Sequence, residues 1–133
     1  QFVRRLKENN IDSIFLIAPP TNNNRIKLII NQATGFLYYV SLKGVTGSVN
    51  INIKQVAQKV QNIKEFTTLP IGVGFGVRNA KTAKEVSLIS DAVVIGSRIV
   101  QEIEDSNDVD LINNIKNLMV EMKNSINHKA ITK

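Results

Sequence analysis

Two short glycine-containing stretches have the residue types that can bind a phosphate group. Gly74-Phe75-Gly76 ends one apolar run, and Gly96-Ser97 follows the next apolar run and opens a helical pattern. Glycines let backbone N–H groups approach an anion closely, and a helix N-terminus offers free N–H groups and the positive end of its dipole. We expect Ser97 to cap this helix and to donate its hydroxyl.

Each stretch alone has a simpler interpretation, because the first is also typical of close helix–strand packing and the second of an ordinary helix cap. Together they match the phosphate site of many (β/α)8 barrels, which is formed by the loops after strands 7 and 8. A third stretch, Gly44-Val45-Thr46-Gly47, follows another apolar run. It is equally typical of a mobile lid with glycine hinges and of a surface turn.

The acidic residues are absent from the positions where catalysis would need them. Eleven residues are Asp or Glu, and none follows an apolar run. Asp12 and Asp91 precede such runs, and the others fall in helical patterns, at their ends or in the last loop. Since a general acid or base must reach the substrate within hydrogen-bond distance, we expect no catalytic residue in this chain.

The remaining composition excludes several classes of protein. The chain has no Cys and one His (His128), which excludes disulfides and a multi-histidine metal site, so we expect no metal and a cytoplasmic location. The net charge of +6 comes from scattered Lys and Arg, so we expect no nucleic-acid partner. No apolar run approaches the ~18 residues of a membrane span.

Apolar periodicity predicts four short strands, each followed by a helix. The predicted strands are 13–18, 36–41, 69–75 and 91–96. Three helices should begin at Asn22 or Asn23 (ending at Gly35), at Asn52 and at Asn79, and two more cover 97–104 and 111–126, after an opening helix within 1–10. This order predicts an α/β fold with parallel strands.

The paired glycine sites identify the four strands as strands 5–8. We therefore predict that residues 1–133 form a single partial domain, the C-terminal half of a (β/α)8 TIM barrel. Half a barrel exposes two sheet edges, so the chain should self-associate or pair with its other half.

Several sequence words resemble the α subunit of tryptophan synthase. They are Ile14-Phe15-Leu16-Ile17-Ala18-Pro19-Pro20, Gly35-Phe36-Leu37-Tyr38-Tyr39-Val40-Ser41, Gly44-Val45-Thr46-Gly47, Gly72-Val73-Gly74-Phe75-Gly76-Val77 and Val94-Ile95-Gly96-Ser97-Arg98-Ile99-Val100. The resemblance implies a lyase of tryptophan biosynthesis that splits indole-3-glycerol phosphate into indole and glyceraldehyde 3-phosphate. It also implies a β-subunit partner that uses pyridoxal phosphate, and no cofactor in the α subunit.

The resemblance also assigns site residues. The family's phosphate contacts match Gly47, Gly76, Gly96 and Ser97. Tyr38 matches the tyrosine near the reacting end of the substrate. The pocket-wall positions match Ile17, Gly74, Phe75 and Val94. Thr46 matches a lid threonine that helps hold a catalytic Asp. The family's catalytic Glu and Asp have no counterpart here, so the chain alone should be inactive. Leu42-Lys43 replaces an Arg that many members have.

Two alternatives remain. The first is another phosphate-binding barrel of amino-acid biosynthesis, such as an isomerase, which would place paired Asp residues on strands 1 and 5. The predicted strand 5 ends in Ala18-Pro19-Pro20 without an Asp, which disfavours the isomerase. The second alternative is a half-barrel that binds a phosphate or a protein partner without catalysis.

Overall fold

Four parallel strands alternate with helices in the part of the chain that the structure describes. The computed structural model describes residues 1–41, 52–74 and 76–127. The elements are α1 (Phe2–Glu8), β1 (Phe15–Ile17), α2 (Asn23–Ile30), β2 (Leu37–Val40), α3 (Ile53–Lys64), β3 (Ile71–Gly74), α4 (Ala80–Ser87), β4 (Ala92–Val94), α5 (Ser97–Asp105) and α6 (Leu111–Ile126). The strands form one sheet in the order β1-β2-β3-β4. Every predicted strand and helix is present.

Three helices begin where the sequence predicts an asparagine cap. The side chains of Asn22, Asn52 and Asn79 each accept a hydrogen bond from the backbone N–H three residues later, at 2.9, 3.1 and 2.9 Å. Each bond satisfies one of the N–H groups that a helix leaves unpaired at its start. The asparagines therefore fix the ends of three of the strand-to-helix connections.

The predicted end of the second helix at Gly35 is wrong. Helix α2 ends at Ile30, and Gly35 lies in the link to β2 with φ +76°. A Cβ at Gly35 would lie 3.0 Å from Ile14 Cδ1 and 3.1 Å from Asp12 Cβ. Glycine is needed there because the chain turns tightly in the left-handed region beside the start of β1.

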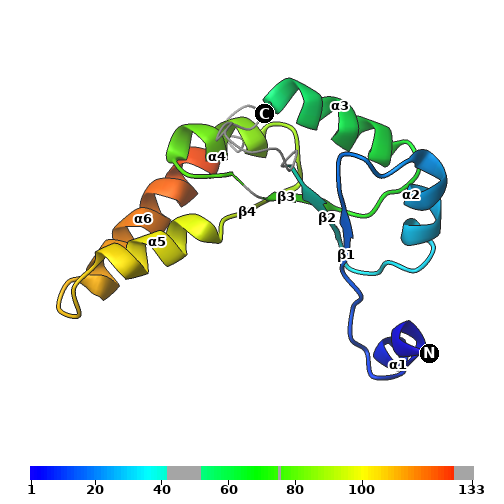
Figure 1. The fold of residues 1–133 in the computed structure, drawn as a ribbon, viewed down its shortest axis with the longest axis horizontal. Helices are drawn as coiled ribbons and strands as arrows, with labels where there is room; N and C mark the ends of the chain where they lie inside the picture. The colour runs from blue at the N-terminus through cyan, green and yellow to red at the C-terminus, as the bar shows by residue number, and fades with distance from the viewer. Residues whose placement is uncertain (42–51, 75, 128–133) are drawn as a thin grey trace.

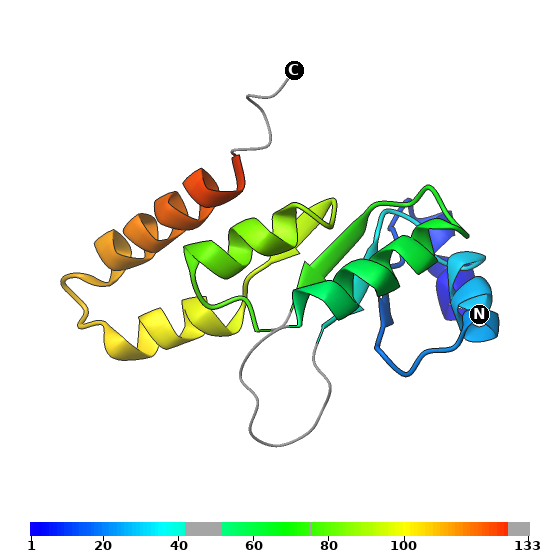
Figure 2. The same ribbon diagram turned by 90° about the horizontal axis from the view of Figure 1, so that it is seen from above.

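One face of the sheet packs against the helices. Along each strand alternate side chains point to the same face, and on this face they are buried together with one stripe of α2, α3, α4 and α6. The shared core comprises Ile17, Ile26, Leu37, Tyr39, Val56, Val60, Ile63, Ile71, Val73, Val77, Ala83, Val86, Leu118 and Met122. Helices α5 and α6 lie side by side, and α4 packs against α6 (Figures 1 and 2). None of the helices in the described residues is long and apolar enough to cross a membrane.

The other face of the sheet is less covered, and both sheet edges are open. Leu16 on this face is 61% exposed, and Ala92 is also exposed. Within the described residues β1 and β4 each pair with one neighbouring strand. A parallel sheet with helices on one face and two open edges has the arrangement expected for half of a barrel.

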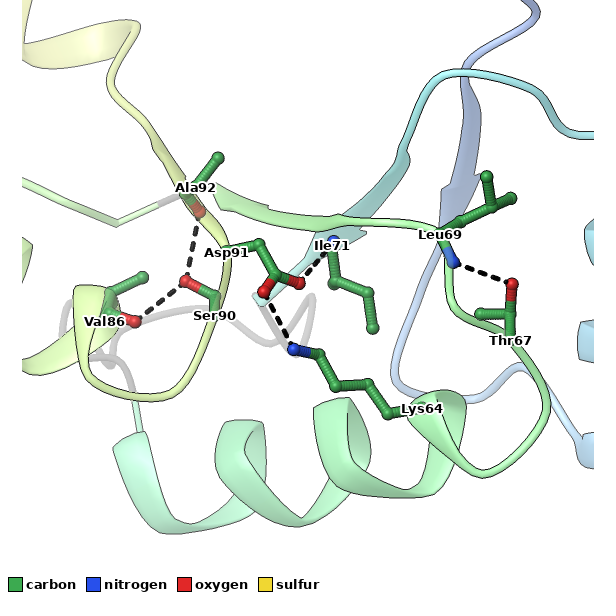
Figure 3. Close-up of polar contacts among 8 residues, drawn as sticks. All are labelled: Lys64, Thr67, Leu69, Ile71, Val86, Ser90, Asp91 and Ala92. Atoms are coloured by element: carbon green, nitrogen blue, oxygen red, sulfur yellow. Dashed lines mark hydrogen bonds and ion pairs between the residues drawn. The ribbon is translucent and has the colours of Figure 1, made fainter.

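The amino ends of β3 and β4 are joined by Asp91. Its backbone N–H donates to the Ile71 carbonyl at 3.0 Å, and its side-chain oxygen accepts from the Ile71 N–H at 2.9 Å. The second oxygen of Asp91 pairs with Lys64 Nζ at 2.9 Å (Figure 3). Beside it, Ser90 Oγ donates to the Val86 carbonyl at 2.8 Å. Asp91 thus holds both polar backbone groups of the buried Ile71.

We predict that Asp91→Ala lowers the free energy of unfolding by about 1–3 kcal/mol, because the buried Ile71 N–H loses its acceptor. Asp91→Asn should cost less, since an amide oxygen can still accept that bond. Lys64→Met, the control, should cost less than about 1 kcal/mol because the ion pair is half exposed. Urea denaturation measures all three, and equal losses for Asp91→Ala and Lys64→Met would contradict this account.

Candidate functional site

The candidate site begins at the less covered face of β3, where two glycines stand in place of side chains. Gly72 and Gly74 are aligned with Tyr38 and Val40 of β2 and with Ala92 and Val94 of β4. A Cβ at Gly74 would overlap the Tyr38 phenol and lie 3.0 Å from Val94 Cβ. The missing side chain therefore makes room for the Tyr38 ring to lie across β3.

Tyr38 and Val94 thus both lie beside Gly74. Burial raises the pKa of the Tyr38 phenol above its ordinary value of 10.0. The phenol is therefore neutral at physiological pH and offers an O–H and an oxygen lone pair, not a charge.

Ile17 does not lie on this face. It is aligned with Tyr39 and fully buried in the core beneath the helices, whereas Leu16 is aligned with Tyr38. The strand register thus assigns Leu16, not Ile17, to the face of Tyr38. Alternation along a strand shows which residues share a face, but it does not show which face lines a barrel.

Ser41, which was not among the predicted site residues, contacts the candidate site. It directly follows β2 and is half-buried. Its backbone N–H and its hydroxyl both donate to the Gly74 carbonyl oxygen, at 3.1 and 2.8 Å. Two features of the sequence could have indicated Ser41: it ends the Tyr38-Tyr39-Val40-Ser41 motif, and it lies at the carboxyl end of a predicted strand.

Two of the predicted phosphate contacts follow neighbouring strands. Gly74 of β3 is aligned with Val94 of β4. Gly76 comes two residues after Gly74, and Gly96 comes two residues after Val94. Gly76 has φ +79°, a conformation that favours glycine, and is half-buried at the turn toward α4. Both glycines therefore lie at the same edge of the sheet, at the carboxyl ends of adjacent parallel strands.

The prediction that Ser97 caps the last-but-one helix is wrong. Gly96 is the N-cap of α5, and no side chain makes a capping hydrogen bond there. Ser97 is the first helical residue and is exposed, and the first turn contains no acidic residue. The N–H groups at the start of α5 thus keep their capacity to bind an anion.

The carboxylates lie elsewhere, as the sequence predicts. Asp91 is at the amino end of the sheet, and Glu102 on α5 pairs with Arg98 at 2.5 Å. Glu8 pairs with Arg4 at 2.9 Å on α1. All eleven acidic residues fall within the described residues, and none follows a strand at the carboxyl edge. This edge includes the uncapped start of α5, but no strand end there supplies a carboxylate for proton transfer.

Several predicted site residues lie outside the described residues. They are Gly44, Val45, Thr46, Gly47 and Phe75. Among the residues that the structure describes, no three His, Cys, Asp or Glu side chains are grouped so that they could hold a metal ion.

We predict that Gly74→Ala lowers the free energy of unfolding by about 1–3 kcal/mol, because the new methyl group overlaps the Tyr38 phenol. Tyr38→Ala should reduce this cost in the double variant, since the ring is then absent. Gly96→Ala is the matched control and should have little effect, because a Cβ there meets nothing within 4 Å. Thermal unfolding of the four variants measures the coupling, and a Gly74→Ala cost that persists without the ring would contradict it.

Comparison with known proteins agrees with this geometry. A family model described as "Tryptophan synthase alpha chain" matches residues 1–130. The chain is 55% identical over 106 residues to the tryptophan synthase alpha chain of Janthinobacterium sp. (strain Marseille), covering 80% of this chain and 40% of the relative. It is 45% identical over 130 residues to that of Nitrosomonas europaea, covering 98% of this chain and 47% of the relative.

Solved structures show the same fold. A tryptophan synthase structure from Mycobacterium tuberculosis superposes with a TM-score of 0.81 at 27% identity, covering 95% of this chain and 46% of that one. The tryptophan synthase alpha chain of Legionella pneumophila superposes with a TM-score of 0.80 at 25% identity, covering 98% of this chain and 48% of that one. The chain thus spans less than half the length of these relatives and has the fold of the C-terminal half of a TIM barrel. It belongs to the tryptophan synthase alpha chain family, whose members serve tryptophan biosynthesis.

Proposed function

We propose that this chain is the phosphate-binding half of an alpha subunit that cleaves indole-3-glycerol phosphate into indole and glyceraldehyde 3-phosphate. The observation that carries the proposal is the carboxyl edge of β3 and β4. There Gly76 and Gly96 follow aligned strands, and α5 begins without a side-chain cap. The reaction is the one that the resemblance implies, and membership of the tryptophan synthase alpha chain family supports it.

The substrate phosphate would bind between these two strand ends. The first turn of α5 presents unpaired N–H groups and the positive end of its dipole, and Ser97 adds an exposed hydroxyl. Gly76 permits a left-handed backbone close to the anion. Gly47 completes the phosphate set by resemblance. With the phosphate held here, the rest of the substrate would extend toward Tyr38.

The indole end would lie on the less covered face of the sheet. Tyr38 and Val94 both lie beside Gly74 there, and the resemblance assigns Phe75 to the same pocket. The neutral Tyr38 phenol can exchange a hydrogen bond near the reacting carbon atoms without adding charge. Proton transfer requires a Glu and an Asp of the other half, because no carboxylate of this chain reaches this edge.

The other half of the barrel and a β subunit are the proposed partners. An apolar groove of about 580 Å³ lies between β4 and α6, lined by Val94, Met119, Val120 and Ile126 among others. In a closed barrel the missing strands pair with the open edges of β1 and β4. A chain without that half should self-associate through the same edges.

Pyridoxal phosphate would be held by the β subunit, and the complex would work in the cytoplasm.

The direct test is lyase activity in a complete barrel. This chain is joined to the part of the Nitrosomonas europaea alpha chain that it does not cover, and indole release from indole-3-glycerol phosphate is measured. We expect turnover from the joined barrel and none from the 133-residue chain alone, because the acid and the base lie in the added part. Indole release by the chain alone, or none by a folded joined barrel, would refute the proposal.

A charge change at Ser97 tests the phosphate site separately. In the joined barrel Ser97→Asp places a carboxylate at the start of α5, where the helix dipole stabilises it. We therefore expect unchanged or slightly higher stability, but a KM for the phosphate substrate at least about tenfold higher, because like charges repel. Ser97→Asn is the neutral control. Equal KM values for the two variants would place the phosphate elsewhere.

A further inference from the structure

We propose that the Ser41 hydroxyl is a positioning group for the phosphate loop, by which we mean the turn at Gly76 where the substrate phosphate is proposed to bind. It acts through the Gly74 carbonyl. The inference rests on the proposed function, since it concerns the same phosphate site. Ser41 contributes through backbone geometry and is not itself assigned to the substrate. Its role is to hold the last peptide of β3 in the orientation from which the chain turns into the Gly76 loop.

Gly74 needs such a restraint because it has no side chain to limit its backbone. Glycine loses more conformational freedom on folding than any other residue. On the open face of the sheet, Tyr38 and Val94 occupy the space beside the Gly74 α-carbon. They restrict that atom, but a peptide plane can still tilt about it. The carbonyl requires its own fixed partner.

Ser41 supplies two donors to that carbonyl. The backbone N–H, at 3.1 Å, continues the parallel ladder between β2 and β3. The hydroxyl, at 2.8 Å, adds a second hydrogen bond to the same oxygen. A carbonyl oxygen has two lone pairs, so both bonds can form together. Two donors from fixed positions define the peptide orientation more tightly than one.

We therefore expect that the Ser41 hydroxyl can be removed without loss of the fold. If it is removed, the Gly74 carbonyl still accepts the ladder bond from the Ser41 N–H, so this acceptor keeps a partner. The sheet should persist while the peptide before the phosphate loop gains freedom. A binding loop that is less well ordered before binding must be ordered at the expense of affinity.

The test uses the joined barrel and inorganic phosphate as the probe, with calorimetry for binding and urea denaturation for stability. We expect Ser41→Ala to weaken phosphate binding by about threefold to tenfold, the range of one hydrogen bond. The KM for indole-3-glycerol phosphate should rise by a similar factor, with a smaller change in kcat. Ser41→Thr keeps the hydroxyl and should restore both values.

Ser90→Ala is the matched control, because Ser90 Oγ also donates to a backbone carbonyl at 2.8 Å, but at the amino end of the sheet. It should leave phosphate affinity unchanged. If Ser41→Ala does not fold, Ser41→Cys, a weaker donor of similar shape, carries the same expectation.

Three results would overturn the inference. Wild-type affinity in folded Ser41→Ala or Ser41→Cys would refute it while leaving the proposed function intact. Equal losses in Ser41→Thr and Ser41→Ala would show that the hydroxyl is not the determinant. A joined wild-type barrel that binds no phosphate would refute the proposed phosphate site and this inference together.

Discussion

The absence of side chains on one face of β3 is the constraint on which the candidate site depends. Gly72 and Gly74 leave this face without side chains, and two aromatic rings fill the space. Phe36, just before β2, lies beside Gly72, and Tyr38 of β2 lies across Gly74. A larger residue at position 74 would displace the phenol that the proposed function needs. The two glycines therefore allow the aromatic rings to pack against β3, and this packing forms the wall of the proposed pocket.

The two ends of the sheet have different physical characters. At the amino end Asp91 uses its backbone and side chain to hold Ile71, and polar groups there are paired with one another. At the carboxyl end the start of α5 is left without a capping side chain. This division agrees with the general behaviour of parallel α/β barrels, in which one end stabilises and the other binds.

The sequence was sufficient to predict the fold because local signals and global order agree. Asn22, Asn52 and Asn79 cap the helices as expected, and the order of strands and helices admits only a parallel sheet. The predicted cap at Ser97 is wrong because a serine that follows a glycine can be either the N-cap or the first helical residue, and here the glycine is the N-cap. Strand alternation left open the face on which Ile17 lies, and the structure places it in the core. Ser41 was not predicted because its acceptor, Gly74, lies 33 residues away.

The first turn of α5 has a consequence for how local sequence preferences compete. Its N-terminus carries neither a capping side chain nor an acidic residue, and it includes a cation, Arg98, where the dipole disfavours one. The pairing of Arg98 with Glu102 one turn later relieves only part of that conflict. The first turn of α5 therefore keeps an unfavourable charge arrangement, which a bound anion would relieve if the proposed function holds. Under the proposed function, the substrate phosphate would supply the negative charge that this helix start lacks, and its binding would stabilise the folded chain.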